Sequence, residues 1–175
     1  MLRLTLLFLA ITACNPAAKK DVASPLPTNP APPRNPYYSR TDTTSLHIPD
    51  SVWKGVLPAN IFQVGRKGGT EKAFTGKFWN YTGLGRYYCA ICGNPLFRSD
   101  GKFSSDCGWP SFFEPSGKNS VTYQPDKSHG LDRIEVLCGR CNSHLGHLFD
   151  DGPPPTGKRY CMNSIILDFE PDLGL

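Results

Sequence analysis

Two C-x-x-C pairs, separated by a long stretch of chain, constrain this sequence more than any other feature. They are Cys89-Ala-Ile-Cys92 and Cys138-Gly-Arg-Cys141. The chain has seven cysteines, and the other three are Cys14, Cys107 and Cys161. A lipid-bearing cysteine, a four-thiolate metal site and a pair of redox cysteines would use all seven. Three disulfides and one free thiol would use them too, so this alternative has to be weighed.

The spacing of the two pairs predicts a structural metal site. Two intervening residues let both sulfurs of a tight turn face one ion, and Gly93 and Gly139 supply conformational freedom. Four thiolates select zinc or iron, and a closed tetrahedral site is the usual zinc solution. A thioredoxin-like redox pair is less favoured, because neither pair opens a helix in a βαβ unit. Disulfides would leave the shared spacing unexplained.

We therefore expect one structural zinc ion per chain, holding together two distant hairpins of a larger sheet. Its ligands are expected to be Cys89, Cys92, Cys138 and Cys141.

The first fourteen residues are typical of a bacterial export signal. Arg3 supplies positive charge, and the apolar run Leu4–Ile11 is far shorter than the roughly 20 residues of a membrane-spanning helix. Ile11-Thr12-Ala13-Cys14 resembles the lipobox of bacterial lipoproteins, in which the cysteine is acylated. A hydrophobic strand with a buried cysteine is the alternative. It is disfavoured because the segment that follows is rich in proline and cannot pack.

The expected organisation is a signal peptide at 1–13, a lipidated cysteine with a proline-rich tether at 14–45, and a globular domain at 46–175. This organisation predicts a membrane-anchored lipoprotein of the bacterial cell envelope that faces the periplasm. The outer membrane is favoured because Asn15 is not acidic. A net charge of +4, spread along the chain, gives no reason to expect nucleic-acid binding.

Short apolar runs separated by glycine and proline predict a mainly β domain. Before them, the N-cap residues Asp50 and Ser51 and the apolar periodicity around Pro58 predict short helices. Strands are expected at 77–81, 86–89, 95–97, 120–123, 131–137, 147–149 and 159–169, the last being bent or divided. Several short strands at close spacing favour a sandwich or barrel.

Cys161 is the best candidate for a nucleophile. Lys158 and Arg159 precede it, and nearby positive charge favours the reactive thiolate. His144 and His147 follow the second cysteine pair, and an imidazole can hold or supply the proton that thiol chemistry needs. The plain alternatives are a buried cysteine and two structural histidines. Histidine ligands of a catalytic zinc are a weaker alternative, because no carboxylate stands at metalloprotease spacing.

Cys107 lies in a loop rich in glycine, proline and aromatic residues, Ser105–Phe113. In such a loop Trp109 can wall a small pocket, although burial in the core is the commoner fate of a tryptophan. The composition of the loop suits a mobile cysteine.

Six segments, in order along the chain, resemble the B-type methionine sulfoxide reductases. They are Gly69-Thr70-Glu71, Cys89-x-x-Cys92-Gly93-x-Pro95-Leu96-Phe97, Gly108-Trp109-Pro110-Ser111-Phe112, Cys138-Gly139-x-Cys141-x-x-His144-Leu145-Gly146-His147, Asp151-Gly152-Pro153-x-Pro155-Thr156-Gly157 and Arg159-Tyr160-Cys161-x-Asn163-Ser164. Many members have glycine at the position of Asp106 and valine or isoleucine at that of Met162.

The resemblance implies two antiparallel sheets with short N-terminal helices, and reduction of the R epimer of methionine sulfoxide in oxidised proteins or peptides. It makes Cys161 the nucleophile that becomes a sulfenic acid, and Cys107 the resolving cysteine that forms a disulfide with it. Trp109 would pack on the substrate methyl group. A thioredoxin-like reductant would then reduce the disulfide. The residues implied to polarise the sulfoxide oxygen are His144, His147 and Asn163.

Two other functional classes stay open on the residues alone. A zinc-stabilised binding module would not need the two lone cysteines, Cys107 and Cys161. A general disulfide oxidoreductase would act on dithiols and ignore sulfoxides.

Overall fold

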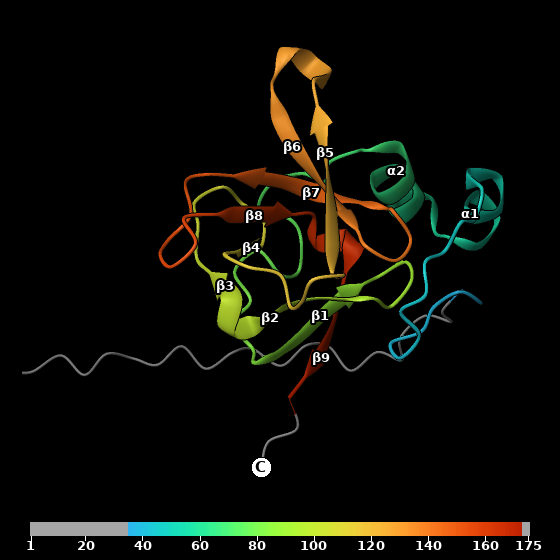
Figure 1. Ribbon diagram of the computed structural model, residues 1–175, viewed down its shortest axis with the longest axis horizontal. Coiled ribbons are helices and arrows are strands. Elements are labelled where there is room, and N and C mark those ends of the chain that lie inside the picture. The colour runs from blue at the N-terminus through green and yellow to red at the C-terminus, as the bar shows by residue number, and fades with distance from the viewer. Residues whose placement is uncertain (1–34, 173–175) are drawn as a thin grey trace, which may run out of the picture.

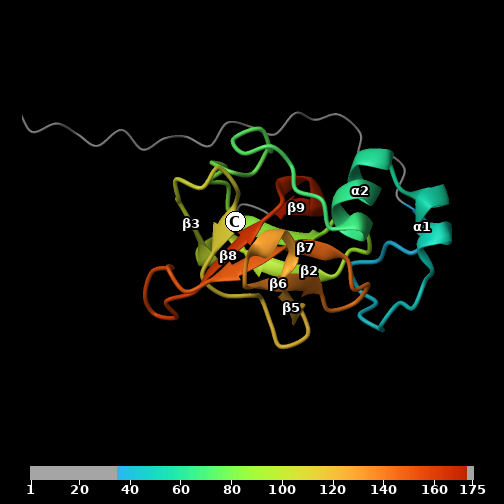
Figure 2. The ribbon, with the colours of Figure 1, turned by 90° about the horizontal axis from the view of Figure 1, so that it is seen from above.

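The computed structural model describes residues 35–172, so Cys14 and the expected signal peptide lie outside the described residues. Two short helices, α1 (Asp50–Val56) and α2 (Ala59–Lys67), pack together on one side of the molecule (Figures 1 and 2). Within the described range no helix combines the length and the apolar character needed to cross a membrane.

The strands of the described chain form two antiparallel sheets. The smaller has the order β2-β1-β9 and consists of β1 (Gly85–Cys89), β2 (Pro95–Arg98) and β9 (Leu167–Pro171). The larger has the order β3-β4-β8-β7-β6-β5 and consists of β3 (Lys102–Phe103), β4 (Ser111–Phe112), β5 (Val121–Asp126), β6 (Arg133–Cys138), β7 (His144–Phe149) and β8 (Arg159–Met162). The β5–β6 hairpin projects from the body of the molecule (Figure 1). The predicted mainly β architecture with short N-terminal helices is confirmed.

The two sheets pack on each other through aromatic side chains. Phe97 of β2 stacks on Phe112 of β4 with ring centroids 4.4 Å apart, and Tyr87 of β1 meets Phe112 edge-on at 5.0 Å. All three side chains are fully buried. Burying a phenylalanine-sized side chain stabilises a fold by roughly 1.5–3 kcal/mol. Because Phe112 belongs to one sheet and its partners to the other, this cluster holds the sheets together.

Both helices begin after a proline rather than at a polar cap. Pro49 and Pro58 occupy the N-cap positions without a side-chain cap, so the N-cap roles expected for Asp50 and Ser51 are wrong. Asp50 is instead the first helical residue, where its carboxylate interacts favourably with the positive end of the helix dipole. Gly68 ends α2 in the left-handed conformation, with φ of 68°.

One expected strand is absent, and one is divided. Residues 77–80 form turns and bends, and Tyr81 is irregular. Phe78 is buried, and its N–H donates to Ser164 Oγ at 2.8 Å instead of to a neighbouring strand. The expected strand 159–169 is split by the 3₁₀ turn Ser164–Ile166 (η3) into β8 and β9, which belong to different sheets. The two-residue strands β3 and β4 were not predicted, since they are too short for a period-two pattern.

The chain that precedes α1 packs against the domain. Tyr37, Leu46 and Ile48 lie on the hydrophobic core, and Asn35 Nδ2 donates to the carbonyl of Ile91 at 2.8 Å. Chain from Asn35 on therefore contacts the domain, although the sequence analysis placed the start of the domain at residue 46.

Candidate active site and metal centre

Four cysteines gather where strands of both sheets end. Cys89 ends β1, and Cys92 lies in the turn that leads to β2. Cys138 ends β6, and Cys141 lies in the turn before β7. All four are buried, and their Sγ atoms lie within 4.8 Å of one another. The cluster thus joins two different sheets, not two hairpins of one larger sheet as the sequence analysis expected.

Each cysteine turn contains one residue in the left-handed backbone region. In the first turn this is Gly93, with φ of 80°, and in the second it is Asn142, with φ of 56°. Gly139, which was expected to supply this freedom, is needed for another reason. A Cβ at Gly139 would lie 2.1 Å from the carbonyl oxygen of Asn119, so close packing excludes a side chain there.

The four thiols fit a zinc ion in chemistry and in spacing. The Sγ atoms of Cys89 and Cys141 are 3.8 Å apart, and those of Cys92 and Cys138 are 3.6 Å apart. A tetrahedral site with Zn–S bonds of about 2.3 Å has sulfur–sulfur edges of about 3.8 Å. Burial raises the pKa of Cys89 and of Cys138, so thiolates at these positions need a bound cation. These residues could hold one metal ion.

Cys107 and Cys161 lie next to each other in space. Cys161 is in β8, where its neighbours across the sheet are Ser111 of β4 and His147 of β7. Cys107 is in the loop before β4, and its Sγ lies 3.5 Å from that of Cys161. A disulfide requires about 2.05 Å, so the two sulfurs need to approach by only about 1.4 Å to bond.

In this conformation Cys107 is the more acidic of the two thiols. Burial raises the pKa of Cys161 to about 12, and the neighbouring Cys107 adds to the rise. Burial also acts to raise the pKa of Cys107, but hydrogen bonds with Ser105 and Ser111 outweigh it and lower that pKa. The expectation that preceding cations favour the Cys161 thiolate is therefore met only in part.

Those two cations are each paired with a nearby carboxylate. Arg159 binds Asp151 through two hydrogen bonds of 2.8 and 2.9 Å, and Lys158 binds Asp150. Arg159 does act to lower the pKa of Cys161, but burial of the sulfur outweighs it.

Cys161 lines a cavity of about 120 Å³. Ordinary small-molecule sites have volumes of roughly 300–1,000 Å³, so this one suits a single side chain. The lining residues are Thr70, Trp109, Arg133, Gly146, His147, Phe149, Cys161, Met162 and Asn163. Four residues selected from the sequence are among them, whereas Cys107 and His144 are not.

His147 is oriented by an acidic partner. Its Nε2 lies 2.7 Å from Asp126 Oδ2, and Arg133 Nη2 donates to the same oxygen at 2.6 Å. Hydrogen bonds with Ser128, His147 and Arg133 hold the pKa of Asp126 well below its usual range. The carboxylate of Asp126 therefore fixes Nε2 of His147 and so sets the orientation of the imidazole ring.

His144 lies behind His147 rather than at the cavity. It is buried, and its Nδ1 lies 2.6 Å from Glu135 Oε1. Burial lowers the pKa of His144, which favours the neutral ring. The two histidine rings meet edge-on with centroids 5.4 Å apart, so His144 can support the position of His147.

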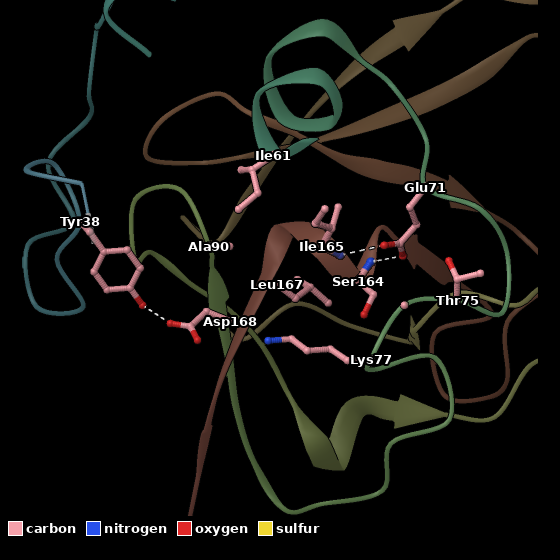
Figure 3. A pocket seen from close by; sticks show the side chains of 11 residues that line it. Tyr38, Ile61, Glu71, Thr75, Lys77, Ala90, Ser164, Ile165, Leu167 and Asp168 are labelled. Atoms are coloured by element: carbon pink, nitrogen blue, oxygen red, sulfur yellow. Dashed lines mark hydrogen bonds between the residues drawn. The ribbon is translucent and has the colours of Figure 1, made fainter. Parts of the chain in front are cut away.

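Glu71 ties together two residues of the cavity wall. Its N–H donates to Asn163 Oδ1 at 2.9 Å, and its carbonyl accepts from Trp109 Nε1 at 3.2 Å. Its carboxylate accepts from the N–H groups of Ser164 and Ile165 (Figure 3). The positions of Trp109 and Asn163 therefore both depend on Glu71, to which the sequence analysis gave no role.

Asp126, Arg133 and Glu135 were also missed. Arg133 and Glu135 stand two residues apart in β6, so they lie on the same face of the strand. Asp126 is the cross-strand neighbour of Arg133, and His147 that of Glu135. The alternating charges of an otherwise apolar strand were the signal that could have found this network.

A larger cavity, of about 500 Å³, lies apart from the cysteine pair (Figure 3). Among the residues that line it are Tyr38, Lys77, Glu71 and Asp168, and none of its lining residues is a cysteine or a histidine. It therefore offers no thiol nucleophile, and thiol chemistry belongs to the smaller cavity.

The smaller cavity presents one thiol to a bound group and keeps a second thiol within reach of the first. Chemistry of this kind oxidises and re-reduces sulfur, so the fold and site define a thiol-dependent oxidoreductase. Residues 57–171 match the SelR domain. The chain belongs to this family, the B-type methionine sulfoxide reductases.

Curated relatives share about half of the aligned residues with this chain. A protein of Thiobacillus denitrificans is 52% identical over 122 residues, which cover 70% of this chain and 92% of the relative. One of Agrobacterium fabrum is 50% identical over 133 residues, covering 75% and 98%. One of Synechococcus is 48% identical over 131 residues, covering 75% and 96%. Each relative is named peptide methionine sulfoxide reductase MsrB.

Proposed function

We propose that this protein reduces the R epimer of methionine sulfoxide, in peptides and proteins, to methionine, with Cys161 as the nucleophile and Cys107 as the resolving cysteine. Family membership supports the reaction. The observation that carries the assignment of roles is that Cys161 lines the cavity while Cys107 stands 3.5 Å behind it.

The side chain of the substrate enters the small cavity. Trp109 packs against its methyl group, and His147 and Asn163 face the sulfoxide oxygen. A pocket that holds methyl and oxygen on set sides accepts one configuration at sulfur, which accounts for R specificity. His144 acts through His147, whose ring it supports.

The first step transfers the oxygen from the substrate to Cys161. His147 protonates the sulfoxide oxygen, which makes the substrate sulfur electrophilic, and the Cys161 thiolate attacks that sulfur to form a transient sulfur–sulfur bond. The hydroxyl then moves to Cys161 Sγ as the sulfur–sulfur bond and the substrate sulfur–oxygen bond break, so methionine leaves and Cys161 carries a sulfenic acid. Methionine sulfoxide is reduced by two electrons, and Cys161 is oxidised by two.

The second step removes the oxygen as water. The Cys107 thiolate attacks Sγ of Cys161, hydroxide departs with a proton, and a disulfide forms. An external dithiol then supplies two electrons and two protons to restore both thiols. A thioredoxin-like protein has the chemistry for this exchange.

The four-cysteine cluster holds one zinc ion with a structural role. The buried tetrad and its sulfur spacing support this assignment. Zinc at such a site neutralises the thiolates and takes no part in the reaction, because all of its coordination positions are filled by protein.

We also propose that Cys14 is lipidated after removal of residues 1–13, so that the domain is tethered to a membrane of the cell envelope and faces the periplasm. The apolar run before Cys14 and the proline-rich segment after it support this proposal. Incorporation of labelled palmitate in a bacterial host that depends on Cys14 is the expected result, and labelling that persists in Cys14→Ala contradicts it.

Assay of the two epimers of a methionine sulfoxide peptide with dithiothreitol tests the reaction. We expect methionine from the R epimer only. Equal rates on both epimers contradict the proposed pocket, and dithiol oxidation without any sulfoxide reduction indicates a general disulfide oxidoreductase instead.

A further inference from the structure

The segment that precedes α1 contacts both cysteine turns of the metal centre. We call residues 35–48 the strap; they are the blue part of the chain in Figure 1. The strap lies outside residues 57–171, the part that matches the SelR domain.

On the first turn, the strap bonds to two successive carbonyls. Asn35 Nδ2 donates to Ile91 at 2.8 Å, and the N–H of Ser39 donates to Cys92 at 3.0 Å. A Cβ at Gly93 would lie 2.4 Å from the carbonyl oxygen of Ser39. The strap backbone is therefore in direct contact with the turn that bears two of the cysteines.

On the second turn, the strap surrounds the side chain of Arg140. Nη2 of Arg140 donates to Asp42 Oδ2 at 2.7 Å, Nη1 to the carbonyl of Tyr37 at 3.1 Å, and Nε to the carbonyl of Thr44 at 3.2 Å. The N–H of Leu46 donates to the carbonyl of Arg140 at 2.7 Å. The Arg140 side chain is only 3% exposed. The strap provides three of its four hydrogen-bond partners.

Arg140 also connects the two turns to each other. Its Nη1 donates to the carbonyl of Cys92 at 2.5 Å. Neither turn can swing away from the metal without breaking bonds to Arg140 or to the strap. A cysteine can release an ion that four thiolates enclose only when the turn that bears the cysteine opens.

We propose that the strap locks both cysteine turns and so slows release of the bound metal. The inference rests on the proposed zinc site. It gives a function to the strap, a segment that lies outside the matched SelR domain. Between these contacts the strap is also fixed to β9: Tyr38 bonds to Asp168 (Figure 3), and Arg40 bonds to Asp168 and to Glu170.

Metal release from the full chain, followed with a coloured zinc chelator, tests the proposal. Arg140→Ala removes the side-chain bonds from the second turn to the strap and to Cys92, and Asp42→Asn removes only the charge of one partner. Arg40→Ala is the matched control, because Arg40 belongs to the strap but binds β9.

Loss of a charge-assisted hydrogen bond corresponds to about a tenfold change in rate. We therefore expect Arg140→Ala to release zinc at least tenfold faster than wild type, and Asp42→Asn to show a smaller increase. Arg40→Ala should stay within about twofold of wild type, because no bond at the turns is lost.

Hydrogen exchange provides a second measurement that does not depend on Arg140→Ala folding normally. Coupling between two sites is reciprocal, so removing zinc from the wild-type protein should speed exchange of the Ser39 and Leu46 amides. The proposal would be overturned if the Ser39 and Leu46 amides exchanged equally fast with and without zinc. It would also be overturned if all variants released zinc at the wild-type rate. Wild-type protein that binds no zinc at all would overturn the metal assignment itself, and the zinc content of the starting material distinguishes the two failures.

Discussion

The sulfur atoms of Cys107 and Cys161 lie 3.5 Å apart, yet only Cys161 lines the cavity beside Trp109 and His147. A substrate side chain in this cavity meets Cys161 first. The product that forms on Cys161 is then within reach of Cys107. The geometry thus gives the two thiols different roles: Cys161 meets the substrate, and Cys107 reacts with the product formed on Cys161.

Cys107→Ser is expected to lower the pKa of Cys161. The charge and hydrogen bond of Cys107 both act to raise that pKa, which is about 12 with Cys107 present. Because the thiolate predominates above the pKa, alkylation of Cys161 should begin at lower pH in the variant. Iodoacetamide labelling across pH, read by mass spectrometry of the Cys161 peptide, measures the midpoint. An unchanged or higher midpoint would show that Cys107 does not control this thiol.

Asp126→Asn is expected to slow methionine formation, because Asp126 Oδ2 lies 2.7 Å from Nε2 of His147 and orients its ring. The loss should be about tenfold, less than the roughly 10²–10⁴-fold contribution of a general acid, because the histidine itself remains. The single-turnover rate of methionine formation measures the loss. Glu135→Gln, which touches His144 instead, is the control and should slow the reaction less. A wild-type rate in Asp126→Asn would contradict this positioning role.

Removal of the metal is expected to lower the melting temperature sharply. Metal binding free energy is folding free energy at sites of this kind, so Cys89→Ser should lose both zinc and stability. Cys161→Ser is the matched control, since Cys161 lies outside the cluster and should keep zinc and native melting. Zinc analysis and calorimetry measure the two quantities. Native melting after replacement of all four cluster cysteines would exclude a structural metal.

Asn163→Ala is expected to reduce the free energy of unfolding as well as activity. Asn163 is buried, its Oδ1 accepts from Glu71 N–H at 2.9 Å, and its Nδ2 donates to the carbonyl of Leu145 at 3.1 Å. Leaving a buried donor unpaired costs about 1–3 kcal/mol. Urea unfolding measures the loss, with His147→Ala as a control expected to lose less. A variant as stable as wild type would show that the amide serves only the substrate.

Local spacing was enough to predict that the four cysteines form one cluster, because two C-x-x-C turns have few other uses. It could not show that the cluster joins two sheets, since sheet membership depends on pairings such as that of β1 with β9. The aromatic run 77–81 was mistaken for a strand for a related reason. Its residues have strand propensity, but Phe78 is held in place by contacts with Ser164 and with Phe169, which are distant in sequence.

Prediction of the site from the sequence was limited in the same way. Cys161 could be selected from its neighbours, and the pairing with Cys107 rested on family resemblance, because no local pattern brings together residues that far apart. Asp126 and Glu71 act through hydrogen bonds to residues on other segments, which only a structure displays. The preceding cations were over-weighted, because their carboxylate partners and the burial of Cys161 could not be read from composition.

Single-turnover reduction of an R-sulfoxide peptide by pre-reduced enzyme, with no reductant added, tests the division of roles most directly. Methionine is quantified by chromatography and the state of each cysteine by mass spectrometry. The account predicts no methionine from Cys161→Ser, and about one equivalent from Cys107→Ser with a sulfenic acid left on Cys161. Methionine from Cys161→Ser, or none from a folded Cys107→Ser, would contradict it.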